Sequence, residues 1–240
     1  MDPFIATRIR RNLIWGLIAS VITVLAGELP IGWVKYPNID GDATGIIGML
    51  LGSADLSLLQ LASGALFGGI FIPLQYFGFK AAADIVALGG NPKSARIIRL
   101  GAVATALWGG IVHVVCVALM FVCRLTVLPY DVLLTTVMEF LLCLVLPISI
   151  VFLPMYYAMT ITLFLTILRG GTCLPRWAAL FNPLLCTFLI NALPMFAPNT
   201  ELINALSMAN MGIGSILTFG GFLCIWLHFV RRNDVIPLGQ

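Results

Sequence analysis

The sequence predicts an all-α protein, a polytopic bundle of six transmembrane helices with both ends on the cytoplasmic side. Hydrophobic residues make up 60% of the 240 residues and charged residues only 10%, whereas about a quarter of a soluble domain is charged. The apolar residues form runs of about 20, the length that crosses a bilayer core of ~30 Å. A single soluble core could not bury so much apolar surface, so lipid must solvate most of the chain.

The spans together form one domain, because the length leaves no room for a separate soluble one. The first span follows a basic cluster, and we expect Ser53 to cap the second. Residues 80–99, with Gly89-Gly90 and Asn91-Pro92, are typical of a loop with some amphipathic helix. The predicted spans cover residues 12–29, 55–79, 100–122, 132–168, 177–196 and 202–230.

Residues 132–168 are too long for one ordinary span and barely long enough for two. Pro147 and Pro154 could kink one helix or mark a break between two. The charges favour one tilted or kinked helix. With six spans and a cytoplasmic N-terminus, all of the 13 basic residues except Lys35 and Arg124 lie on the cytoplasmic side, as the positive-inside rule requires. We therefore expect a multi-pass protein of the cytoplasmic membrane with both termini inside.

Several function classes lack support in the sequence. The basic residues lie in short clusters between spans, which gives no surface for nucleic acid. The cysteines lie mostly inside apolar runs, without metal-ligand or redox spacing. We expect no metal and no cofactor. Small residues let helices approach closely in lipid, and they could also join copies of the chain into a homo-oligomer. The glycines concerned are Gly64, Gly68, Gly69, Gly109, Gly110, Gly212, Gly214, Gly220 and Gly221.

Polar residues at membrane depth are the candidate site residues, because ionisable groups in hydrocarbon need a partner or a wet cavity. His113 and Glu139 fall in the outer halves of the third and fourth spans. We predict that they line a shared cavity and supply acid–base chemistry. The candidate ligand-binding residues are Glu28, Gln60, Asn191 and Asn210. Each also has a structural reading, as a wet interfacial residue or as a hydrogen bond between helices. His228, beside Arg231-Arg232, is expected at the interface.

Ordered motifs along most of the chain resemble an uncharacterised family of bacterial six-helix membrane proteins, known only as a domain of unknown function. The pieces are 27–32 (GELPIG), 72–74 (IPL), 109–113 (GGIVH), 174–177 (LPRW), 181–184 (FNPL), 190–191 (IN) and 207–211 (SMANM). Two positions depart from the family, which usually carries Asp where Glu28 stands and Arg where Gln60 stands. The resemblance implies the six-helix topology and a bacterial inner membrane, but no activity.

Three functions remain open at this point. The first is binding, or intramembrane conversion, of a small lipophilic molecule in a polar pocket of the outer half. The second is a small-solute transporter or channel, against which stand the few polar groups of the inner half. The third is a structural or partner-binding membrane subunit, favoured by the glycine-rich faces. No catalytic motif decides whether the protein is an enzyme.

Overall fold

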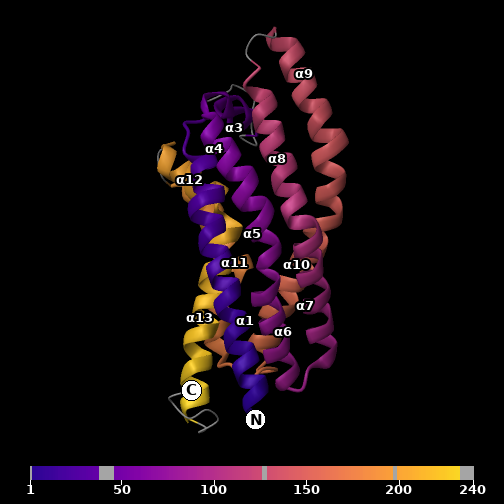
Figure 1. Cartoon of the computed structure of the whole chain (residues 1–240), viewed down its shortest axis with the longest axis vertical. Helices are drawn as coiled ribbons and strands as arrows, with labels where there is room; N and C mark the ends of the chain where they lie inside the picture. Colours follow the sequence, from indigo (N-terminus) through magenta and orange to yellow (C-terminus); the bar gives the residue numbers. More distant parts are fainter. Residues whose placement is uncertain (1, 38–45, 126–128, 197–198, 233–240) are drawn as a thin grey trace.

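The computed structural model describes residues 2–37, 46–125, 129–196 and 199–232, and among them it is all-α. Five helices are long and apolar enough to cross a membrane (Figure 1). A sixth apolar helix, Pro183–Met195, is shorter. The start of the first helix and the end of the last lie at the same end of the bundle (Figure 1), which fits an even number of passes.

The first helix begins and ends beyond its predicted span, whereas the second begins inside its predicted span and ends beyond it. The first runs from Pro3 to Gly32 as α1 (Pro3–Ile22), the π-helical segment η1 (Thr23–Glu28) and α2 (Leu29–Gly32). The second runs from Leu58 to Leu88 as α4 (Leu58–Ser63), the π-helical η3 (Gly64–Gly68), α5 (Gly69–Leu74) and α6 (Tyr76–Leu88). Between them lie α3 (Ile46–Gly52) and the short η2 (Ser53–Asp55).

Ser57, not Ser53, caps the second helix, so this prediction is wrong. The Ser57 side chain accepts from the backbone N–H of Gln60, and Oε1 of Gln60 accepts from the Ser57 N–H at 2.8 Å. This reciprocal arrangement satisfies two donors that the helix start would otherwise leave open. The Ser53 hydroxyl instead donates to the carbonyl of Met49.

The third helix extends from Pro92 to Cys123 as α7 (Pro92–Ala104), the π-helical η4 (Thr105–Gly109) and α8 (Gly110–Cys123). Most of residues 80–99 is therefore helix rather than loop, because α6 and α7 continue past the predicted spans. Only residues 89–91 connect them, and Gly90 there has a φ of 82°. Glycine adopts this left-handed conformation without a steric penalty.

Residues 131–168 form one continuous helix, as expected from the charges. It consists of α9 (Tyr130–Phe140), the π-helical η5 (Leu141–Val145) and α10 (Leu146–Leu168). Pro147 lies where η5 passes into α10, inside the continuous helix. Pro154 lies inside the helix without ending it.

The last two predicted spans are less regular than expected. The 177–196 span is a 3₁₀ helix, η6 (Arg176–Phe181), followed by a short α11 (Pro183–Ala192) and η7 (Leu193–Met195). At 1.5 Å per residue, α11 is shorter than a bilayer core. The 202–230 span is divided at Ala209 into α12 (Glu201–Met208) and α13 (Asn210–Arg232).

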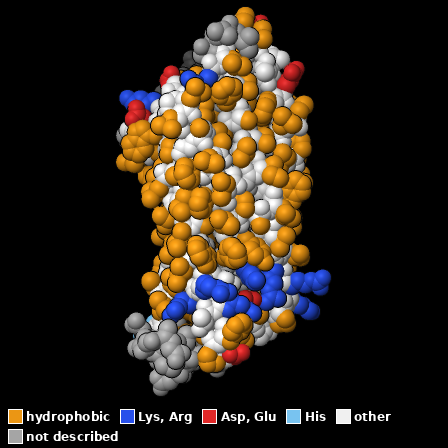
Figure 2. All heavy atoms as spheres, in the orientation of Figure 1, with side chains coloured by type: hydrophobic (Ala, Val, Ile, Leu, Met, Phe, Trp, Pro, Cys, Tyr) orange, Lys and Arg blue, Asp and Glu red, His pale blue; other side chains and the backbone are white. Residues whose placement is uncertain are grey.

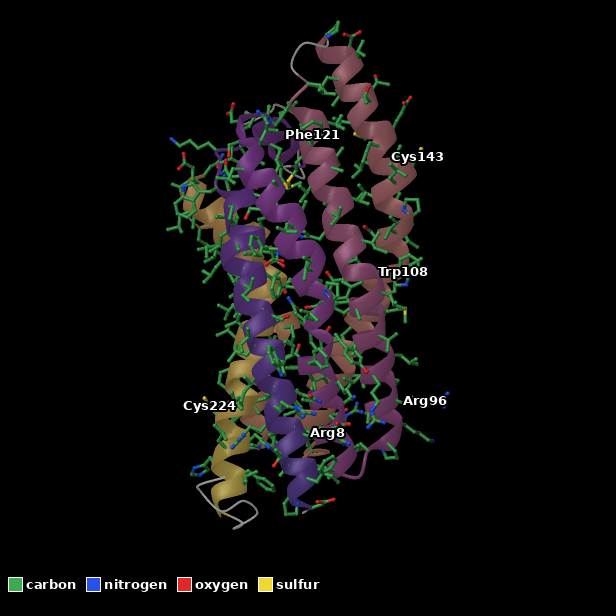
Figure 3. The ribbon with its side chains drawn as sticks, in the orientation of Figure 1. Arg8, Arg96, Trp108, Phe121, Cys143 and Cys224 are labelled. Atoms are coloured by element: carbon green, nitrogen blue, oxygen red, sulfur yellow. The ribbon has the colours of Figure 1, made fainter. Side chains whose placement is uncertain are left out.

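Lys and Arg side chains form a band at the end of the bundle where α1 begins, below an apolar surface (Figure 2). We call this end the basic end. It also contains residues 89–91 and the C-terminal end of α13. The buried carboxylate of Asp84 accepts there from Arg99 at 2.8 Å and from Arg8 at 3.3 Å. These ion pairs join α1, α6 and α7. Arg8 and Arg96 mark this end in Figure 3.

The half of the bundle next to the basic end, the basic half, contains a packed apolar core. Its largest buried side chains include Phe79, Phe219, Phe222 and Trp226. The rings of Phe79 and Phe219 meet edge to face at 4.9 Å between centroids. A Cβ on Gly78 would lie 2.5 Å from the Phe219 ring, so the absence of a side chain at Gly78 leaves the space that this ring of α13 occupies.

Candidate functional site

A cavity of about 260 Å³ lies in the half of the bundle away from the basic end, which we call the far half, and reaches toward its middle. All five long helices contribute to its wall, together with α11 and α12. Its polar lining residues are Glu28, Gln75, Thr105, His113, Tyr156, Tyr157, Thr187, Asn191, Asn210 and Ser215. Its apolar lining includes Ile31, Ile72, Met120, Phe152, Met208 and Met211. The cavity is therefore of mixed polar and apolar character.

Glu28 is the carboxyl group of this cavity. It ends the π-helical segment η1 and is 7% exposed. Its Oε2 is buried and has no hydrogen-bond partner. A Cβ on Gly212 of α13 would lie 2.2 Å from this oxygen. Gly212 thus leaves the space in which the carboxyl group lies.

His113 of α8 lies on the same cavity. Its Nε2 is 3.1 Å from the carbonyl oxygen of Gly64. A carbonyl only accepts, so Nε2 carries the proton of this bond and Nδ1 is the remaining ring nitrogen. A Cβ on Gly68 would lie 2.0 Å from the imidazole. The glycines of η3 therefore provide both the space and the acceptor for this ring.

Glu28 and His113 approach the cavity from two sides of η3. A Cβ on Gly27, beside Glu28, would lie 3.0 Å from the backbone nitrogen of Gly68. Three π-helical segments, η1, η3 and η4, meet the site: Glu28 and Thr105 line it directly, and η3 holds His113. Such irregular turns inside helices are frequent at functional sites, because they redirect side chains and release backbone carbonyls.

A second polar atom of the cavity, the hydroxyl oxygen of Thr187, is buried without a partner among the described residues. An unmade hydrogen bond at a buried group costs ~1–3 kcal/mol. Gln75 donates to the Thr23 hydroxyl over 3.5 Å, a long hydrogen bond. The wall of the cavity therefore holds several polar groups whose bonding capacity the described protein atoms leave unused.

Asn191 of α11 and Asn210 of α13 complete the site. Both line the cavity, and Nδ2 of Asn210 donates to Oδ1 of Asn191 at 2.9 Å. Asn191 is exposed, whereas Asn210 is half-buried. This pair connects the cavity with the surface of the bundle.

The structure does not bring Glu139 to His113. Glu139 lies on α9 with an exposed side chain and is not part of the cavity wall. The shared cavity predicted for the two residues is therefore not formed. Glu28 takes that place, because η1 and α8 flank η3, whereas the face of α9 that carries Glu139 is turned outward.

Gln60 also lies away from the cavity. Both polar atoms of its amide form hydrogen bonds. Oε1 accepts from the Ser57 N–H in the helix cap, and Nε2 donates to the carbonyl of Pro30 at 2.9 Å. Its contacts are those of a structural residue at the start of the second helix.

The sequence analysis did not single out Tyr156, Tyr157, Thr187 or Ser215. Thr187 lies four residues before Asn191, hence on the same helix face, which was a usable signal. Tyr156 and Tyr157 follow Pro154 within an apolar helix, where two adjacent hydroxyl groups are unusual.

A larger hollow of about 650 Å³ lies near the basic end, lined by Leu174, Trp177, Cys224 and His228 among others. Among the described residues, none of the buried side-chain N or O atoms without a hydrogen-bond partner belongs to this hollow. Its wall therefore lacks the unpaired polar groups of the first cavity. Cys224 and, on the far half, Cys143 point outward (Figure 3). Within the described ranges, no group of three or more His, Cys, Asp and Glu could hold a metal ion.

Comparisons with known proteins give a family but no activity. No curated protein matches the chain. No solved structure matches it either. One family model, described as a family of unknown function (DUF6796), matches residues 1–228. This confirms the resemblance to an uncharacterised family. The chain belongs to the family of unknown function DUF6796.

Proposed function

We propose that this membrane protein binds a small lipophilic molecule and holds its polar head in the cavity at Glu28 and His113. One observation carries the proposal: Glu28 and Thr187 each present to a single cavity a buried polar atom that has no partner among the described residues. Buried polar groups are almost always paired. Two exceptions around one space mark a place where a ligand supplies the missing bonds. The apolar residues between them suit a lipophilic molecule.

Glu28 and His113 are the recognition groups of this site. The Glu28 carboxyl accepts a bond when ionised and can also donate one when protonated, and Nδ1 of His113 offers a second position. The pair has the group types that acid–base chemistry requires. Conversion of the ligand by His113 therefore stays a prediction, with Glu28 in place of Glu139 as its carboxyl partner.

The packed core of the basic half favours binding over a channel. Below the cavity, α6, α10 and α13 continue toward the basic end with buried Phe79, Met159 and Phe219. These large side chains pack together between the cavity and the basic end. A transporter would have to separate these helices to open a path. A binding site that is open on one side requires no such movement.

Two carboxyl variants test the proposal. The protein is purified in lipid nanodiscs, and lipophilic molecules that remain bound are extracted and quantified by mass spectrometry. Glu28→Gln should lower the bound amount about tenfold, since a hydrogen bond to a charged group contributes ~1.5–3 kcal/mol. Glu139→Gln, the matched control on the exposed face of α9, should leave it unchanged. Equal occupancy in wild type and Glu28→Gln would contradict the proposal.

We also propose that the basic end faces the cytoplasm and that the protein resides in a bacterial inner membrane. The band of Lys and Arg supports this orientation through the positive-inside rule (Figure 2). A reporter inserted at Gly171, near the basic end, should report cytoplasm. A periplasmic signal there would reverse the orientation.

A further inference from the structure

The opening of the cavity lies at the hydrogen-bonded pair Asn191–Asn210. Both residues line the cavity, and Asn191 reaches the surface of the bundle. Their side chains meet at 2.9 Å across α11 and α13. Asn210 also donates to the carbonyl of Ser207 at 2.6 Å, which holds it at the break between α12 and α13. A movement of α11 that breaks the Asn191–Asn210 bond would widen this opening.

The surface around the opening is apolar. Asn191 shares a face of α11 with Phe188, three residues before it, and lies two residues before the η7 segment that ends at Met195. These two apolar side chains are 73% and 79% exposed. Across the cavity, Val151 and Met155 of α10 are exposed beside the lining residues Phe152 and Tyr156. Such a rim belongs in hydrocarbon, so the opening faces the bilayer rather than water.

The cavity is too small for a whole lipid. Ligand pockets that enclose a drug-sized molecule hold ~300–1,000 Å³, and this one holds about 260 Å³. A head group fits, but a long apolar chain does not. Because the opening has an apolar rim, the chain of such a ligand would lie outside, in the bilayer.

The wall of the cavity also selects the head group. It includes the Glu28 carboxyl and several hydroxyl and amide groups, but no Lys or Arg among the residues that line it. Phosphate recognition relies on cationic side chains, and a carboxylate would repel it. A hydroxyl or amine head would instead donate to Glu28, whose Oε2 lacks a partner.

We propose that the ligand is a lipid with an unphosphorylated hydroxyl or amine head, which enters the cavity sideways from the bilayer beside Asn191, between α10 and α11. The inference rests on the proposed function, and it adds the class of ligand and the route. The head reaches Glu28, and the chain remains among the membrane lipids beside Phe188 and Met155.

The test uses a long-chain alcohol that carries a diazirine next to its hydroxyl, and the same chain with a phosphate head. Each probe is added to the full protein in nanodiscs and photolysed, and the labelled residues are identified by mass spectrometry. The alcohol should label cavity residues of the wild type, and the phosphate should not. Asn191→Trp should cut labelling of the cavity by about tenfold or more, a loss equivalent to ~1.4 kcal/mol. Leu189→Trp, an exposed neighbour outside the cavity wall, is the matched control.

Each result has a separate meaning. Undiminished labelling in Asn191→Trp overturns the lateral route, while the proposed function stands. Equal labelling by the phosphate probe overturns the head class. If neither probe labels the cavity and Glu28→Gln retains all bound lipid, the proposed function itself is wrong.

A second measurement covers the case in which Asn191→Trp does not fold. Asn191→Cys, made in a variant whose native cysteines are replaced by Ala or Ser, is treated with a lipid-soluble maleimide or with a charged, water-soluble thiol reagent. Reaction with the lipid-soluble reagent alone is expected. Rapid reaction with the charged reagent would place the opening in water and overturn the route.

Discussion

The two halves of the bundle differ in how tightly their side chains pack and in how completely their buried polar groups are paired. In the basic half, large rings fill the space between α1, α6 and α13, and the Asp84 carboxylate accepts from two arginines. In the far half, Glu28 and Thr187 line a cavity with buried polar atoms that lack partners among the described residues. Both halves bury a carboxyl group, but only one supplies its counter-charge.

This difference separates stability from function. Fully paired and packed groups stabilise the fold, whereas unpaired buried groups cost free energy and persist where function requires them. Substitutions in the basic half should therefore lower stability. Substitutions at the cavity should change ligand binding and leave stability unchanged or raised.

The largest effect is expected at Gly78 of α6, on which the Phe219 ring of α13 packs. Gly78→Leu places a side chain where even a Cβ lies 2.5 Å from the Phe219 ring. Overpacking of this kind should lower the free energy of unfolding by about 3 kcal/mol or more. Thermal unfolding in detergent measures it. Gly220→Ala, where a Cβ meets nothing closer than 3.8 Å, should be neutral, and a similar loss in both variants would contradict the tight packing.

Asn182, at the start of α11, should show the next largest effect. Its buried Nδ2 donates to the carbonyl of Thr160, and its Oδ1 caps the N–H of Leu184, both at 2.9 Å. Asn182→Ala removes both bonds and should cost about 2 kcal/mol of unfolding free energy. Asn182→Ser keeps a cap oxygen and should cost about half as much. Equal costs would mean that the cap on the N–H of Leu184 contributes nothing.

Two Thr→Val variants test the difference between the halves, because they should change the unfolding free energy in different directions. Thr218→Val removes a hydroxyl that donates to the carbonyls of Gly214 and Phe181, which should lower the unfolding free energy by about 1 kcal/mol. Thr187→Val removes a hydroxyl without a partner, so stability should stay constant or rise by up to about 1 kcal/mol. Chemical unfolding of both variants measures the two signs. A clear loss in Thr187→Val would show that the cavity hydroxyl is structural.

The smallest effect is expected at Asp84. Arg8 and Arg99 are partly exposed, so water can solvate them when the carboxylate is neutralised. Asp84→Asn should lower the unfolding free energy by less than about 1 kcal/mol, and the difference from wild type should shrink at high salt. Thermal unfolding at low and high ionic strength measures both. A loss of several kcal/mol that salt does not change would place these pairs in a dry interior.

Much of the fold could be predicted because hydropathy and charge act locally. Runs of apolar residues located the helices, and the basic clusters indicated that residues 131–168 form one helix. The helix ends were wrong where polar residues continue a helix beyond the apolar run, as Asp84 does in α6. The irregular α11 was missed because its composition is that of an ordinary span.

The partner of His113 was decided by tertiary structure. A helix that contacts lipid on one side and protein on the other is apolar all round, so its sequence does not reveal which face turns inward. Depth alone therefore paired His113 with Glu139. The rotation of each helix is set by contacts such as Gly68 with His113 and Gly212 with Glu28, and these contacts bring Glu28 to the cavity and leave Glu139 exposed.

The sequence by itself determined that this is a helical membrane protein with a basic end, because composition, run length and charge placement follow from residues close together in the chain. Only the tertiary structure decided which polar residues meet. That outcome depends on glycines that let particular helix faces approach, and on π-helical turns that redirect side chains into one space. Both effects join residues far apart in the sequence, such as Glu28, His113 and Thr187.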